Sequence, residues 1–297
     1  MKDDWTHNYK NVGEIKIHYV EEGSGDLIIL LHGFPDFWYS WRLQIPVLSR
    51  NFRVVAPDLR GYNKSSKPKG VDNYSTSVLV NDILGLMEAL GEEKAVIIGH
   101  DWGGFIAWNL AMKSPEKLSK LVIINCPHPI PLLEAFWSMR FQQLQKSWYV
   151  FFFQIPRIPE EIASKDNYEV LQRMLLGSVS SKQVFKEEDI QKYIEAWSQP
   201  GALEASINYY RANWNITQIL SIKKEHQEEL IQRFPKIKCP TLVIWGEKDV
   251  ALDRSLTYGL EEHIEGSHKI VYHPEFGHWI HVETPEFVNN TILSFLK

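Results

Sequence analysis

The sequence has little cysteine and no long hydrophobic run. Its two cysteines, Cys126 and Cys239, each stand next to a proline, and no CxxC spacing occurs among the 297 residues. This argues against a disulfide-stabilised scaffold and against a thiolate zinc site. The aliphatic run Leu27 to Leu31 is far shorter than the ~20 residues that a membrane-spanning helix needs. The sequence therefore predicts no transmembrane helix.

Positive charge is also scarce. There are 32 Lys and Arg residues against 37 Asp and Glu residues, which gives a formal net charge of -5. A protein that binds nucleic acid or an anionic membrane surface usually carries a basic patch, so neither partner is expected. The first residues, Met1 to Trp5, are acidic and lack the apolar core of a signal peptide, which favours a cytoplasmic location.

Aromatic residues, in contrast, are abundant. The chain has 11 Trp, 12 Tyr and 14 Phe residues, and its 44% hydrophobic and 23% charged residues indicate a folded globular protein. Aromatic side chains line apolar pockets as well as cores. An apolar small molecule is therefore the expected partner, and no sequence signal indicates an oligomeric state.

Short apolar runs alternate with amphipathic stretches along much of the chain. The runs predict strands over 14–20, 27–31, 53–56, 95–98, 121–124, 241–245 and 269–272, and the amphipathic stretches predict helices over 77–90, 105–112 and 285–296. The first strand alternates polar and apolar residues and is predicted to be half-exposed. Strands that alternate with helices form βαβ units. The predicted fold class is therefore α/β, with a mostly parallel sheet flanked by helices.

The strand pattern is interrupted in the middle of the chain. From residue 129 to residue 235 only amphipathic helical stretches broken by prolines occur. A chain of 297 residues is about twice the usual domain length, so it has room for an insert. We predict a discontinuous core formed by 1–128 and 236–297, and an inserted α-helical cap domain over 129–235.

The motif Gly99-His100-Asp101-Trp102-Gly103-Gly104 follows one predicted strand and opens a helix. Glycines on both sides of one polar residue are typical of a nucleophile elbow, a strained turn that raises one side chain above the sheet. The raised residue is Asp101. An aspartate could instead merely cap the helix, but a cap does not require glycines on both sides. The GxGxxG spacing of dinucleotide sites is absent, and no cofactor is expected.

Three more positions follow predicted strands, at the sheet edge where open α/β proteins bind ligands. In His32-Gly33-Phe34-Pro35, the backbone N–H of Phe34 could point at the same oxyanion as the N–H of Trp102. Asp249 and His278 then complete the chain order nucleophile, acid, histidine. Jointly these positions predict a catalytic triad led by the elbow aspartate, with an oxyanion hole.

Other candidates for these roles are weaker. Asp58, in Pro57-Asp58-Leu59-Arg60-Gly61-Tyr62, more simply fixes a turn, and His100 is too close to the elbow to reach around it. His278 and His281 could suggest a metal site, but two ligands do not make one, and no metal is expected.

With these motifs in view, the chain resembles the α/β-hydrolase superfamily over nearly its whole length, and within it the epoxide hydrolases. The resemblance rests on the motif at 32–35 together with the motif at 99–103. That family carries two tyrosines in its helical lid. The segment 149–156 looks like the first tyrosine motif and implicates Tyr149. Asn208-Tyr209-Tyr210-Arg211 looks like the second and implicates Tyr210, although a one-residue shift would exchange it for Tyr209.

An aspartate nucleophile suggests a particular chemistry. With a pKa of about 4 it is ionised at neutral pH and can attack an sp³ carbon to form an alkyl ester. Two phenols can protonate the opening oxygen of an epoxide, and water activated by His278, with Asp249 orienting the imidazole, can then hydrolyse the ester to a vicinal diol. The expected substrate pocket includes Phe34, Trp102 and Trp279.

Two alternatives remain open. Haloalkane dehalogenases share the aspartate and the following tryptophan, but usually carry asparagine where this chain has Phe34. The fluoroacetate dehalogenases are not among the open alternatives, because they carry arginine where this chain has Trp102. A catalytically silent, lidded binding protein is an alternative of another class. It would be favoured if Asp249 lay outside hydrogen-bonding reach of His278.

Overall fold

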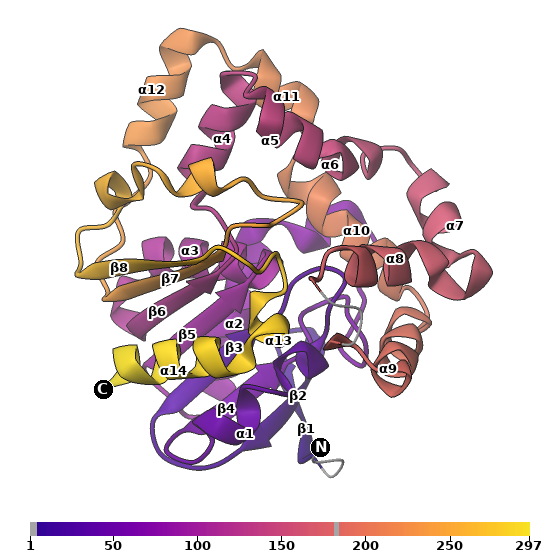
Figure 1. Cartoon of the computed structure of the whole chain (residues 1–297), viewed down its shortest axis with the longest axis vertical. Coiled ribbons are helices and arrows are strands. Elements are labelled where there is room, and N and C mark those ends of the chain that lie inside the picture. The colour runs from indigo at the N-terminus through magenta and orange to yellow at the C-terminus, as the bar shows by residue number, and fades with distance from the viewer. Residues whose placement is uncertain (1–4, 181–183) are drawn as a thin grey trace.

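The structure is a computed structural model that describes residues 5–180 and 184–297. Within this part of the chain, the strands form one eight-stranded sheet in the order β1-β2-β4-β3-β5-β6-β7-β8 (Figure 1). The strands are β1 His7–Val12, β2 Ile15–Glu22, β3 Leu27–Leu31, β4 Arg53–Pro57, β5 Ala95–His100, β6 Leu118–Ile124, β7 Thr241–Gly246 and β8 His268–His273. The pairs β1/β2 and β2/β4 are antiparallel and the others are parallel. The predicted α/β class with a mostly parallel sheet is confirmed.

Helices cover both faces of the sheet. In Figure 1, α2 and α3 lie behind it, and α1 and α14 lie in front. These helices and the short helix before α14 are α1 Ile45–Leu48, α2 Thr76–Ala89, α3 Trp102–Lys113, α13 Ile280–Glu283 and α14 Pro285–Leu296. Because both faces are covered, β3, β5 and β7 are buried at every position, which explains their continuous apolar sequences.

Nine further helices follow β6 and precede β7 in the described residues, and we call them the inserted helices. They are α4 Pro129–Trp137, α5 Phe141–Lys146, α6 Trp148–Phe152, α7 Ile158–Ser164, α8 Glu169–Gly177, α9 Glu187–Trp197, α10 Ala202–Asn213, α11 Ile216–Ser221 and α12 Lys224–Gln232. Figure 1 shows most of them above the end of the sheet at which β6 leads into α4. They therefore cover the loops that follow the parallel strands. Across the described ranges, no helix has the length and apolarity needed to cross a bilayer.

Two details of the sheet differ from expectation. Strand β1 was not predicted, because its sequence is mostly polar and it lies exposed at the edge of the sheet. The half-exposed character predicted for β2 is wrong: five of its eight residues are buried. Strand β2 pairs with β1 on one side and β4 on the other, and His18 is covered by Asp58, whose Oδ2 lies 2.6 Å from its Nδ1. Burial of this strand therefore depends on its neighbours.

Candidate active site

Asp101 lies in the tight turn between β5 and α3. Its backbone φ is +50°, a strained value for a residue with a side chain. The turn packs so closely on the loop after β3 that a Cβ on Gly103 would collide with the backbone of Leu31, and one on Gly33 would collide with the Asp101 side chain. The glycines are therefore required by close approach, as the sequence motif predicted for an elbow.

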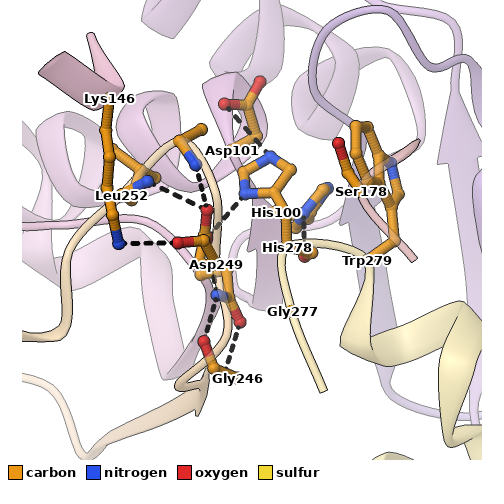
Figure 2. A network of polar contacts seen from close by, with 12 residues as sticks. His100, Asp101, Lys146, Ser178, Gly246, Asp249, Leu252, Gly277, His278 and Trp279 are labelled. Atoms are coloured by element: carbon orange, nitrogen blue, oxygen red, sulfur yellow. Dashed lines mark hydrogen bonds and ion pairs between the residues drawn. The ribbon is translucent and has the colours of Figure 1, made fainter. Parts of the chain in front are cut away.

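His278 lies between two carboxylates (Figure 2). Its Nδ1 is 2.8 Å from Oδ2 of Asp249, and its Nε2 is 3.7 Å from Oδ2 of Asp101. The two acidic residues follow β5 and β7, and the histidine follows β8, so the parallel sheet itself brings the three together. The hydrogen bond to Asp249 leaves Nε2 facing the elbow.

Both carboxylate oxygens of Asp249 accept hydrogen bonds. Its Oδ1 accepts the backbone N–H groups of Ala251 and Leu252 at 2.7 and 2.9 Å, and its Oδ2 also accepts from Nδ2 of Asn125 at 2.7 Å. Asn125 is itself fixed, because its Oδ1 accepts the N–H of Gly246 at 2.8 Å. Burial would raise the pKa of Asp249, but His278 and these donors lower it, so the carboxylate stays ionised.

Sequence reasoning missed Asn125. It directly follows the buried strand β6, at the same sheet edge as the residues that were selected. That position was the available signal. Its residue type gave no reason to single it out, because the amide acts on Asp249 and not on a ligand.

The electrostatics of the site favour a protonated His278. Burial lowers the pKa of this imidazole, but the charge and hydrogen bond of Asp249, followed by the charges of Asp101 and Asp36, raise it to about 9. At neutral pH these interactions favour an imidazolium at His278. Any event that neutralises Asp101 removes one cause of the high pKa.

One oxygen of Asp101 is occupied by a backbone donor. The N–H of Phe34 donates to Oδ1 at 2.7 Å. Trp102 is the first residue of α3, where backbone N–H groups lack partners within the helix. The Oδ2 oxygen faces His278, and Oδ1 faces the N–H of Phe34, one of the two predicted oxyanion donors.

Tyr149 and Tyr210 come from α6 and α10 and line the space above Asp101. Their rings meet edge to face, with centroids 5.8 Å apart. Burial, and then the negative charge of Asp101, raise the pKa of both phenols well above 10, so both carry their proton at neutral pH. Tyr209 points elsewhere: its hydroxyl donates to the carbonyl of Arg60 at 2.6 Å. The geometry thus groups Tyr210, and not Tyr209, with the elbow.

The cavity at Asp101 has two lobes that share Asp101, Tyr149 and Tyr210. One lobe is mainly apolar and is lined by residues that include Trp102, Phe105, Cys126, Leu132, Phe136 and Trp214. The other lobe is lined by residues that include Phe34, Lys146, Trp148, Ser178, His278 and Trp279. The three residues predicted for the pocket, Phe34, Trp102 and Trp279, all line one lobe or the other.

A second polar cluster lies behind His278. Within the described part of the chain, Asp36, His100 and His281 form the group whose ligand atoms, all within 4.8 Å of one another, come nearest to a metal site. Both oxygens of Asp36 already accept hydrogen bonds, from the hydroxyl of Tyr193 at 2.7 Å and from Nε1 of Trp279 at 3.0 Å. We therefore interpret Asp36 as a hydrogen-bond acceptor for Tyr193 and Trp279 and not as a metal ligand. His100 contacts the site directly, because its Nε2 donates to the backbone carbonyl of His278 at 2.9 Å.

Comparison with known proteins gives a consistent picture. Residues 26–285 match the family model of the alpha/beta hydrolase fold. The chain is 41% identical to the AB hydrolase superfamily protein YfhM of Bacillus subtilis (strain 168), over 97% of both chains. It is 38% identical to epoxide hydrolase 4 of Homo sapiens, over 98% of this chain and 79% of that protein. A similar solved structure is a mutant epoxide hydrolase from Bacillus megaterium complexed with its product, (R)-3-[1]naphthyloxy-propane-1,2-diol, with 32% identity, a TM-score of 0.88, and coverage of 97% of this chain and 99% of that one.

Proposed function

Because this chain belongs to the epoxide hydrolases of the α/β-hydrolase fold family, we propose that it hydrolyses an apolar epoxide to a vicinal diol through an ester on Asp101. The observation that carries this proposal is the arrangement of Asp101 in one cavity with two protonated phenols on one side and His278 on the other. A carboxylate nucleophile, an acid for the leaving oxygen and a base for water are the three groups that the reaction needs.

In the first step, Oδ2 of Asp101 attacks a ring carbon, and the carbon–oxygen bond of the epoxide breaks. The electron pair goes to the ring oxygen, which takes a proton from Tyr149 or Tyr210. The raised pKa values of the phenols keep these protons available until the much more basic alkoxide forms. The product of this step is a hydroxyalkyl ester on Asp101 and a phenolate.

In the second step, once His278 has lost its proton to solvent, water gives a proton to its Nε2 and attacks the ester carbonyl carbon of Asp101. The Phe34 N–H, which is 2.7 Å from Oδ1, and the Trp102 N–H stabilise the oxyanion; such a donor contributes about 3 kcal/mol. The intermediate then expels the diol oxygen, which takes the proton from His278. The carboxyl proton returns to the phenolate and restores the enzyme.

The high pKa of His278 leads to a prediction about pH. Forming the ester removes the charge of Asp101, one cause of the value of about 9, so the pKa of His278 should fall below about 9 in the intermediate. Only neutral His278 can accept the proton of water, so ester decay should increase with pH and level off below pH 9. Rapid-quench single turnovers across pH, compared with an NMR titration of His278 in the free enzyme, test this. Identical midpoints in the two experiments would contradict the coupling.

Asp249→Asn should weaken the second step more than the first. The variant loses the charge that raises the pKa of His278, and the orientation of the imidazole is no longer fixed by a carboxylate. We expect ester hydrolysis to fall about 10²–10⁴-fold, the usual range for general base catalysis. Separate measurement of alkylation and decay rates tests it; an equal loss in both rates would assign Asp249 a merely structural role.

The haloalkane dehalogenase alternative predicts a different substrate. Phe34 has no side-chain amide to stabilise a halide, and the paired phenols favour an oxygen leaving group. A panel of styrene oxide, a naphthyl glycidyl ether, 1-bromobutane and p-nitrophenyl esters separates the possibilities. We expect turnover of the two epoxides; turnover of the bromide alone would replace the proposal, and no turnover with binding alone would favour the silent receptor. Against that receptor stands the 2.8 Å contact between Asp249 and His278.

We further propose that residues 129–235 act as a cap domain over a core formed by 1–128 and 236–297. This proposal is supported by the different residues that the two parts contribute to the site. Both phenols come from the inserted helices, whereas Asp101, Asp249 and His278 come from loops at the sheet edge. Because the reaction uses only these side chains and water, the proposal includes no cofactor.

A further inference from the structure

One face of the inserted helix α9, at the lower right in Figure 1, is tied to the core by polar contacts at regular spacing. Asp189, Tyr193 and Trp197 lie four residues apart and therefore on one side of the helix, and all three are buried. The hydroxyl of Tyr39 donates to Oδ1 of Asp189 at 2.9 Å, and Nε1 of Trp197 donates to the carbonyl of Pro35 at 2.6 Å. These two contacts attach the helix to the loop after β3.

The middle contact leads toward the proposed active site. The hydroxyl of Tyr193 donates to Oδ1 of Asp36 at 2.7 Å, and the other oxygen of Asp36 accepts from Nε1 of Trp279, the residue after His278. Oδ2 of Asp36 also lies 3.7 Å from Nδ1 of His100. The other ring nitrogen of His100, Nε2, donates a hydrogen bond to the backbone carbonyl of His278. A carboxylate that is 1% exposed thus joins the inserted helix α9 to Trp279, the residue that follows His278.

We propose that Tyr193 and Asp36 are positioning residues for the hydrolytic step, and that through them the inserted helix α9 sets the position of His278. This inference rests on the proposed function. Each oxygen of the buried Asp36 carboxylate has one strong donor, so loss of the Tyr193 hydroxyl leaves a buried charge under-solvated and free to turn. Trp279, the neighbour of His278, would then lose a fixed partner.

The two steps of the reaction depend on this support to different degrees. Attack on the epoxide requires Asp101 and the two phenols. In the described part of the chain, the side-chain hydrogen bonds of Asp36 and Tyr193 go to one another and to Trp279, and not to these three residues. Ester hydrolysis requires Nε2 of His278 to meet a water that is itself aligned on the ester. Small displacements of a general base are costly in rate.

The test is Tyr193→Phe in the full chain, with styrene oxide as the substrate. We expect alkylation of Asp101 to stay within about twofold of the parent and ester hydrolysis to slow about tenfold, the loss corresponding to one hydrogen bond to a charged group. The ester should then accumulate, so kcat and KM should fall together. Rapid quench and mass spectrometry of the intact protein measure the accumulated ester. Asp36→Asn, which keeps the side-chain size, should show the same pattern and serves if Tyr193→Phe does not fold.

Tyr39→Phe is the matched control. It removes one buried phenol hydroxyl that ties the same helix to the core, while Arg42, with Nε 3.2 Å from Asp189, still holds that end. We expect no extra ester in this variant. Equal accumulation in Tyr39→Phe, or normal ester decay in both Tyr193→Phe and Asp36→Asn, would overturn the inference. Failure of the proposed function is distinguishable, because in that case no variant forms an ester, His278→Gln included.

Discussion

His278→Gln is expected to leave epoxide opening active and to stop the enzyme with substrate attached to Asp101. Glutamine cannot take the proton of water, and loss of a general base costs about 10²–10⁴-fold in rate, so steady-state turnover should fall about 10³-fold or more. Attack by the ionised Asp101 needs no base. After incubation with styrene oxide, the intact protein should gain the mass of one substrate molecule, and peptide mapping should locate it at residue 101.

A histidine outside the cavity provides the matched control. His273, at the end of β8, packs against Phe276 and Phe287 and lines neither lobe of the cavity. His273→Gln should turn over epoxide normally without a trapped adduct. An unmodified His278→Gln protein that is folded by circular dichroism would argue against the two-step scheme.

The double replacement Tyr149→Phe and Tyr210→Phe should nearly abolish epoxide opening. Without a phenol, the ring oxygen would have to leave as an unprotonated alkoxide in an apolar cavity, so we expect alkylation of Asp101 to fall about 10³-fold. Each single variant should retain more activity, because one phenol remains. Pre-steady-state alkylation rates measure the effect. Alkylation of Asp101 by the double variant at the parent rate would remove the two phenols from the mechanism.

Tyr209→Phe tests the assignment of the second phenol. Its hydroxyl binds the Arg60 carbonyl, away from the cavity, so its loss should cost about 1 kcal/mol of stability and little activity. Urea unfolding and epoxide turnover measure the two effects. If instead Tyr209→Phe lost activity and Tyr210→Phe kept it, the roles of the two tyrosines would be exchanged.

Local sequence features predicted much of this molecule. The strands before Asp101 and Asp249 are buried on both faces and therefore have continuous apolar sequences, which can be recognised without a structure. The glycines around Asp101 are required by contacts within a few residues or with one neighbouring strand. A mostly parallel sheet then implies that residues after different strands meet at one edge. The α/β class and the family followed from these features.

Other features depend on contacts that a sequence does not display. Asn125 and Asp36 act on other side chains, and their importance depends on which loops the sheet brings next to them. The choice between Tyr209 and Tyr210 depends on how α10 is rotated over the core, which the Arg60 carbonyl helps to decide. Strand β1 is polar because it lies at an exposed edge, so it lacks the apolar signal that identified the other strands.

A single turnover in water labelled with oxygen-18 tests the central claim most directly. If solvent attacks the carbonyl carbon of an ester on Asp101, the label should enter the carboxylate of residue 101, and the first diol released should carry an oxygen from the protein instead. Mass spectrometry of the peptide containing residue 101 and of the diol reads out both products. Label found only in the diol, with none at residue 101, would show that water attacks the epoxide directly and would contradict the account.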